Sequence, residues 1–103
     1  MDNNQFSTID SLDYYKNQIY KMLGLFESKD KNGYKHAIKI RAKLDNLPHQ
    51  FPQLYQDLRL SLVITNLDIL IEELIFMDGE HQYVANHVFE SMNLLDNIEE
   101  GLR

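Results

Sequence analysis

The chain has 103 residues, no cysteine and a net charge of −6 at pH 7. This length fits one domain, and the lack of cysteine excludes a disulfide framework, a thiolate zinc site and a cysteine nucleophile. The negative charge argues against nucleic-acid binding across a broad surface, because such surfaces are basic. The first residues lack the basic and apolar regions of a secretory signal, so we expect a cytoplasmic protein.

Apolar residues at helical spacing predict four helices in a single domain over residues 1–103, with residues 1–6 flexible. The helices are predicted over about residues 8–28, 34–46, 53–77 and 80–100. Ser7 or Thr8 is the expected cap of the first helix. Short connections between helices favour antiparallel neighbours, so the predicted fold is an all-α, antiparallel, up-and-down four-helix bundle.

Two prolines separate the second predicted helix from the third. Pro48 and Pro52 each disfavour helical backbone in the preceding residue, which predicts a loop over residues 47–52 with Phe51 packed onto the bundle end. The second helix is then the shortest, and the third is nearly twice as long. We expect the second half of the third helix to extend beyond the second helix, where a partner subunit could dock.

The third predicted helix is apolar on two faces. At 100° per residue, its core stripe comprises Leu60, Val63, Ile64, Leu67, Leu70, Ile71 and Leu74. A second stripe lies almost opposite and comprises Leu58, Leu62, Ile69 and Phe76. A helix with two apolar faces needs packing partners on both. Charged residues interrupt the helix at Arg59, Asp68, Glu72 and Glu73, which argues against a membrane span.

The fourth predicted helix adds apolar residues on a flank of its own core stripe. That core stripe comprises His81, Val84, Ala85, Val88, Met92, Leu95 and Leu102. Monomers of this size rarely expose large apolar patches, so the remaining apolar residues predict an interface. We predict a two-fold homodimer through the third helix, with help from the fourth. The predicted interface residues are Leu58, Leu62, Ile69, Phe76, Tyr83, Leu94 and Ile98.

The sequence offers little chemistry for catalysis or metal binding. Di-iron bundles use Glu-x-x-His pairs, and the nearest spacings here are Asp78 with His81 and His87 with Glu90. No serine lies in a nucleophile elbow, and the four glycines are isolated rather than grouped in a phosphate loop. We therefore predict a non-enzyme without catalytic, cofactor-binding or metal-binding residues and without a cofactor.

Charge is unevenly distributed along the chain. Residues 1–56 carry a charge of +2 and residues 57–103 carry −8. A candidate acidic surface comprises Asp68, Glu72, Glu90 and Asp96, which could imitate a nucleic-acid backbone. The alternative, which we favour, is internal neutralisation, in which the basic second helix packs beside acidic helices. One row of that helix carries Lys35, Lys39 and Lys43.

In size and helical format the chain resembles the small four-helix immunity and inhibitor proteins of bacteria and phages. That resemblance implies a protein that blocks a protein partner. We predict a non-enzymatic protein-binding module, an adaptor or an inhibitor, with an unidentified protein partner, no membrane association and no direct nucleic-acid binding. Two alternatives stay open: an acidic nucleic-acid mimic that inhibits a nuclease, and a bundle that binds a metal or small ligand in its core.

Overall fold

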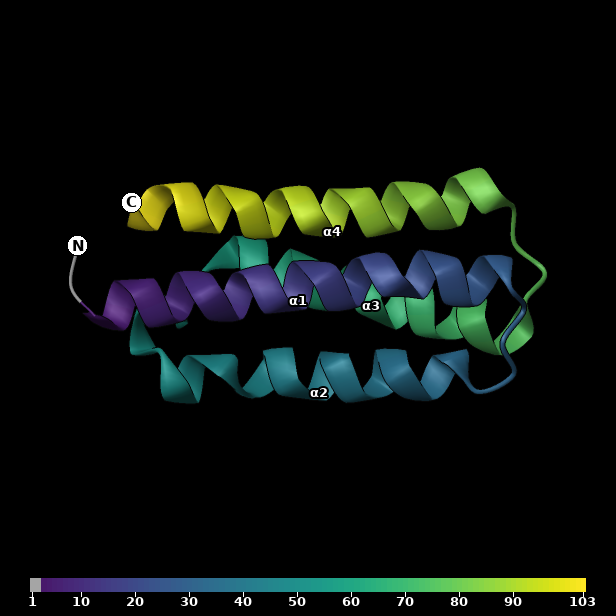
Figure 1. Cartoon of the computed structure of the whole chain (residues 1–103), viewed down its shortest axis with the longest axis horizontal. Coiled ribbons are helices and arrows are strands. Elements are labelled where there is room, and N and C mark those ends of the chain that lie inside the picture. The colour runs from purple at the N-terminus through teal and green to yellow at the C-terminus, as the bar shows by residue number, and fades with distance from the viewer. Residues whose placement is uncertain (1–2) are drawn as a thin grey trace.

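The computed structural model describes residues 3–103, with side chains described from residue 7 onward. The described chain is helical, with α1 (Asn3–Glu27), α2 (Gly33–Gln50), the 3-10 helix η1 (Pro52–Leu54), α3 (Leu58–Phe76) and α4 (His81–Leu102). The four α-helices form an antiparallel bundle in which each packs against the next and α4 closes against α1 (Figure 1). This confirms the predicted four-helix bundle. None of the described helices is long and apolar enough to cross a membrane.

The core runs along the axis of the bundle and uses the predicted stripe of α3. Leu67 is fully buried, while Ile64 and Ile71 at the edges of the stripe are partly buried. The remaining members of the stripe are buried, namely Leu60, Val63, Leu70 and Leu74. They meet buried residues of the other helices, including Leu12, Ile19, Ala37, Ile40, Val88 and Leu95. The helical period of the apolar residues therefore located the core of α3.

Two predictions for α4 are wrong. Ile98 was expected in the interface, but it is only 2% exposed, because α3 packs on that flank of α4 and covers it. His81 was expected in the core stripe, but its side chain is exposed and bonds to Glu27. His81 is the first residue of α4, at the end of the bundle.

The helix boundaries around the prolines also differ from the prediction. α2 continues through Pro48 to Gln50, so only the end of the expected loop over residues 47–52 is non-helical. Pro48 lies in the last turn, where buried Leu47 and the hydrogen bond from the Phe51 N–H to the Leu47 carbonyl (3.0 Å) hold the helix. Phe51 is buried against the core, which confirms its predicted packing.

The third helix is shorter than predicted, so the expected overhang beyond the second helix is wrong. α3 begins at Leu58, where the Asp57 carboxylate accepts a hydrogen bond from the Arg59 N–H at 3.0 Å. An aspartate in this position is a favourable helix cap. α2 and α3 have 18 and 19 residues, and both are shorter than α1 and α4.

The first helix begins earlier than the expected cap at Ser7 or Thr8. α1 starts at Asn3, so residues 3–6 of the segment expected to be flexible belong to a helix, and residues 1–2 lie outside the described part. Thr8 is buried, and its Oγ1 accepts a hydrogen bond from Gln53 Nε2 at 2.9 Å. That contact ties this part of α1 to the segment that follows α2.

The end of α1 offers a test of backbone strain. Lys29 has φ = 54°, while its N–H bonds the Phe26 carbonyl and the Asp30 N–H bonds the Leu25 carbonyl. A helix that ends with these two hydrogen bonds usually has glycine at the left-handed position, because a Cβ is unfavourable there. Lys29→Gly is therefore expected to raise the free energy of unfolding by about 0.5–1 kcal/mol in urea denaturation.

Lys31→Gly is the matched control, because Lys31 lies in the same turn without a positive φ. Glycine there relieves no strain and adds conformational freedom to the unfolded chain, so stability should stay equal or fall. Stabilisation by both substitutions, or by neither, would contradict the strain at Lys29.

Candidate functional site

Exposed apolar side chains follow the outer side of α3 and continue onto the flank of α4. The most exposed are Leu58 (77%), Phe76 (68%), Leu62 (50%) and Tyr83 (41%). Scattered single residues of this kind are ordinary, but these four share one side of a helix pair. We call this surface the α3/α4 face, and it comprises Leu58, Leu62, Ile69, Phe76, Tyr83 and Leu94. Ile69 and Leu94 are half-buried members of it.

The two helices contribute to this face at matching levels. The Arg59 Nη1 on α3 donates to the Asn97 carbonyl on α4 at 3.0 Å, which fixes the register of the antiparallel pair. With that register and a common rise of about 1.5 Å per residue, Leu62 lies at the level of Leu94, and Phe76 lies near the level of Tyr83. Six of the seven predicted interface residues are therefore exposed or half-buried on the neighbouring helices α3 and α4, whereas Ile98 is buried.

The apolar stripe of α3 has a seven-residue repeat. Leu62, Ile69 and Phe76 occupy equivalent positions of this repeat. Leu58, Thr65 and Glu72 occupy the intermediate positions of the same stripe. A seven-residue repeat keeps one side of a helix turned toward a helical neighbour, as in coiled coils. The α3 stripe thus has the spacing of a helix-packing surface, although no described helix covers it.

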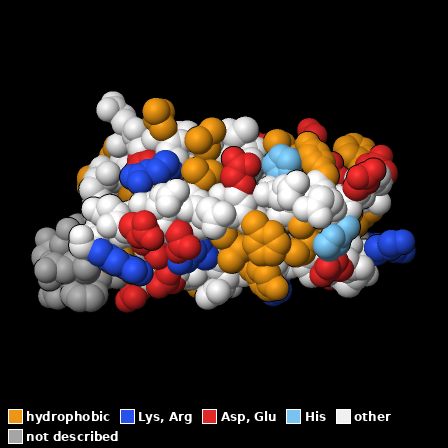
Figure 2. All heavy atoms as spheres, turned by 90° about the horizontal axis from the view of Figure 1, so that it is seen from above, with side chains coloured by type: hydrophobic (Ala, Val, Ile, Leu, Met, Phe, Trp, Pro, Cys, Tyr) orange, Lys and Arg blue, Asp and Glu red, His pale blue; other side chains and the backbone are white. Residues whose placement is uncertain are grey.

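A second pair of exposed aromatic side chains lies on the opposite flank of α4. The rings of Tyr20 on α1 and Phe89 on α4 have centroids 6.1 Å apart, and both are about half exposed. Figure 2 views the bundle from the side of α4 and shows several apolar patches separated by acidic side chains. Phe89 therefore provides a comparison for Phe76, with the same residue type on another surface.

The four candidate acidic residues do not form one strip. Asp68 accepts a hydrogen bond from Arg41 Nε of α2 at 2.7 Å, whereas Asp96 binds Lys16 of α1 at 2.5 Å. These ion pairs lie on different sides of the bundle, because α1 neighbours α4 and α2 neighbours α3. Glu72 and Glu90 are exposed and have no ion pair among the described residues.

The ion pair of Asp68 supports internal neutralisation for part of the acidic set. The contribution of α2 comes from Arg41 rather than from the row expected to provide it. In the described part of the chain, Lys35, Lys39 and Lys43 are exposed and make no ion pair. That row is the solvated back of α2 and leaves Glu72 and Glu90 uncompensated.

A cluster of charged groups around the buried Glu99 joins α1 to α4. The Lys16 ammonium lies 3.0 Å from Asp13, 2.5 Å from Asp96 and 3.0 Å from Glu99. Glu99 is only 1% exposed, and its carboxylate also lies 3.6 Å from the Arg103 guanidinium. Sequence reasoning did not identify this cluster. The sequence does contain one indication of the cluster: Glu99 lies four residues after the core residue Leu95, on the same side of α4.

Burial changes the proton affinity of Glu99. Burial, followed by the neighbouring Asp13, raises the pKa of Glu99 to about 7. The hydrogen bond from Glu99 lowers the pKa of Asp13. Burial disfavours the charged form of Lys16, but hydrogen bonds to the carboxylates, that of Asp96 first, raise the pKa of Lys16. Glu99 Oε1 is buried and has no hydrogen-bond partner among the described residues, which agrees with a carboxyl group whose ionised form is disfavoured by burial.

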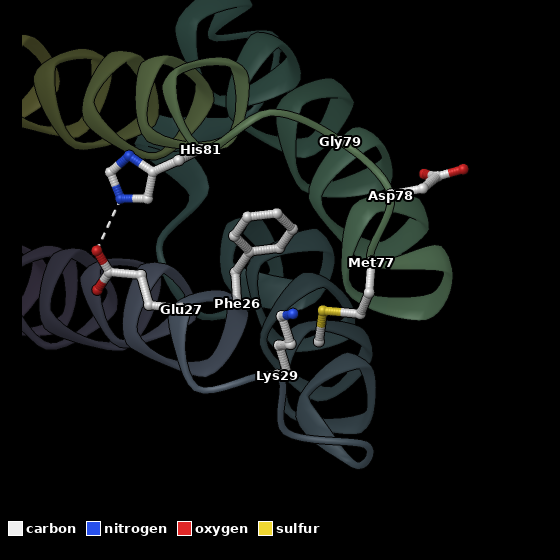
Figure 3. A pocket seen from close by; sticks show the side chains of 7 residues that line it. All are labelled: Phe26, Glu27, Lys29, Met77, Asp78, Gly79 and His81. Atoms are coloured by element: carbon white, nitrogen blue, oxygen red, sulfur yellow. Dashed lines mark hydrogen bonds and ion pairs between the residues drawn. The ribbon is translucent and has the colours of Figure 1, made fainter.

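An open pocket of about 410 Å³ lies between the α1–α2 turn and the α3–α4 turn. It is lined by Phe26, Glu27, Lys29, Met77, Asp78, Gly79 and His81 (Figure 3). His81 Nε2 and Glu27 Oε2 lie 2.7 Å apart, and Asp78 points away from them. The described residues contain no group of three or more His, Cys, Asp and Glu placed to hold a metal ion. None of the lining residues is a serine, threonine or cysteine.

Comparison with known proteins found no protein family that matches the chain, and no curated protein or solved structure with significant similarity to it.

Proposed function

We propose that this chain is a non-enzymatic protein-binding module that occludes a protein partner, and that the α3/α4 face is its binding surface. The observation that carries the proposal is the exposure of Leu58, Leu62 and Phe76 along one stripe of α3 while a separate stripe supplies the core. Buried apolar side chains contribute about 1.5–3 kcal/mol each relative to exposed ones, so covering this stripe would favour association. A cytoplasmic setting, expected from the sequence, is part of the proposal.

The nucleic-acid mimic has less support than the protein-binding module. A mimic needs a continuous array of free negative charge, but Asp68 and Asp96 are engaged with cations on different sides of the bundle. The homodimer expected from the sequence would use the same α3/α4 face and stays a prediction. Such a homodimer would have twice the molecular mass of the chain in solution.

Photo-crosslinking from inside the face tests the proposal. A benzophenone amino acid replaces Leu62 in the full chain, expressed in its source cells, and irradiation follows. Leu62 is half exposed, so the fold should accept the larger side chain. We expect a discrete covalent adduct with another polypeptide, which mass spectrometry of the purified adduct identifies.

The same amino acid at Ile38 is the matched control, because Ile38 is a similarly exposed aliphatic residue on α2. An adduct from position 62 and none from position 38 supports the α3/α4 face as the binding surface. Equal adducts from both positions, or none from position 62, would contradict the proposal. An adduct of twice the chain mass would identify the partner as a second copy.

A further inference from the structure

We infer that the occupant of the α3/α4 face is an amphipathic helix of another protein, with an apolar stripe flanked by lysine or arginine. This inference rests on the proposed function, since it names the class of partner for the same surface. Its basis is the combination of a helix-packing repeat with uncompensated negative charge on one surface.

The charge around the face has one sign. Between Arg59 and Arg103 the chain contains nine Asp and Glu and neither Lys nor Arg. Arg59 itself is held by both oxygens of Asp57, at 3.0 and 2.9 Å. Glu72 and Glu90 have no ion pair among the described residues. A partner on this surface must therefore bring the cations.

Glu72 places part of this charge on the apolar stripe. Glu72 lies three residues after Ile69 and four before Phe76, so the three side chains share one side of α3. A helix packed along the stripe would desolvate the exposed Glu72 carboxylate, which favours a lysine or arginine opposite it.

A second copy of the chain is the main alternative occupant. A two-fold axis brings the same surface of both copies together, so the free carboxylates of Glu72 and Glu90 would approach their own equivalents. Arg59 and Arg103 are the only cations in residues 57–103, and both already contact carboxylates. Juxtaposition of like charges opposes this packing, whereas a basic partner is attracted by the same groups.

The shape of the surface favours a helix as the docking segment. The stripe follows the 19 residues of α3, a length of about 28 Å, and repeats every seven residues. An amphipathic helix laid in a groove between two helices reads such a surface through anchors spaced one or two turns apart. The pairing of Leu62 with Leu94 at one level, and of Phe76 with Tyr83 at another, provides two such anchor positions.

Two synthetic helical peptides of about 19 residues test the inference. Both carry leucine in a seven-residue repeat and alanine elsewhere, but the flanking positions are lysine in one peptide and glutamate in the other. Fluorescence anisotropy measures the binding of each labelled peptide to the full chain at pH 7. We expect the lysine peptide to bind at least about tenfold more tightly, with a preference that shrinks between about 50 and 300 mM NaCl.

Variants of the chain locate the binding. Leu58→Asp with Phe76→Asp changes the two most exposed apolar residues of the face and should weaken the lysine peptide at least about tenfold. Tyr20→Asp with Phe89→Asp is the matched control, because it adds the same charge at exposed apolar residues on the α1 flank of α4 and should leave binding within about twofold. Thermal melting of both variants checks that they are folded.

Several outcomes would overturn the inference. These are no binding of the lysine peptide, equal binding of both peptides, or an equal loss in both double variants, which indicates attraction to the acidic chain in general. Analytical ultracentrifugation that finds a dimer near 10 µM, dissociated by Leu58→Asp with Phe76→Asp, would assign the face to a second copy. The peptide comparison on the unaltered chain does not depend on any variant folding. An adduct from position 62 alongside negative peptide results would leave the proposed function standing without this partner class.

Discussion

Leu67→Ala is expected to lower the free energy of unfolding by about 2–5 kcal/mol, as is typical of large-to-small changes at fully buried leucines. Leu67 is 0% exposed and lies near the middle of α3. Its removal leaves a cavity that neighbouring helices fill only in part, because each is held by its own buried residues. Urea denaturation with a fixed m-value for both proteins measures the change.

Ile75→Ala is the matched control on the same helix, since Ile75 is about half exposed. It should cost less than about 1 kcal/mol, the scale of ordinary surface changes. Similar losses for the two substitutions would mean that the assigned faces of α3 are incorrect. The contrast thus tests the rotational phase of the helix that carries both the core and the α3/α4 face.

Glu99→Gln is expected to abolish a dependence of stability on pH amounting to about 3 kcal/mol. The pKa of Glu99 is raised from the ordinary value of 4.5 to about 7, because the carboxyl group is buried beside Asp13. The folded state therefore holds the proton more tightly than the unfolded state. The stability that this tighter proton binding contributes is fully present below about pH 4.5, and it is lost as the pH rises through about 7.

Glutamine keeps a neutral side chain of the same size that can accept a hydrogen bond from Lys16, but it does not titrate. The stability of the variant relative to the unaltered chain should therefore increase by about 3 kcal/mol between pH 5 and pH 8. Chemical denaturation at a series of pH values measures this difference.

Glu100→Gln is the matched control for Glu99→Gln, because Glu100 is the next residue and is exposed. Its stability relative to the unaltered chain should not vary between pH 5 and pH 8 by more than a few tenths of a kcal/mol. A constant difference for Glu99→Gln over this pH range would mean that the pKa of Glu99 is not raised in the folded chain.

The pattern of apolar residues was sufficient to predict the helices and the core of α3. Leu60, Leu67 and Leu74 are spaced seven residues apart, so they lie on one side of any α-helix. Their common burial therefore follows from local geometry. The same period placed Leu58, Leu62 and Phe76 on an opposite side, where they are exposed. Both results depend only on spacing along one helix, which a sequence contains in full.

The helix ends near Pro48 and Asp57 depended on tertiary contacts. The local preference of proline predicts a loop, but burial of Leu47 and Phe51 holds α2 in helical form to Gln50. η1 follows at Pro52–Leu54, and α3 starts only at Leu58, where Asp57 caps the helix. Proline propensity is a local free energy of a few kcal/mol, and packing of two large apolar side chains is of the same size.

The length, the apolar period and the excess of acid in residues 57–103 are properties of the sequence itself, and they determined a small helical bundle with an acidic second half. Which acids are free and which are paired was decided only by the tertiary structure. Lys16 meets Asp96 across 80 positions of sequence, and Arg41 meets Asp68 across 27. The sequence likewise did not distinguish Ile98 from Leu94, whereas in the structure Ile98 is buried and Leu94 is only half-buried. The physical reason is that helical phase specifies a direction around one axis, whereas burial and charge pairing require the neighbour that lies in that direction.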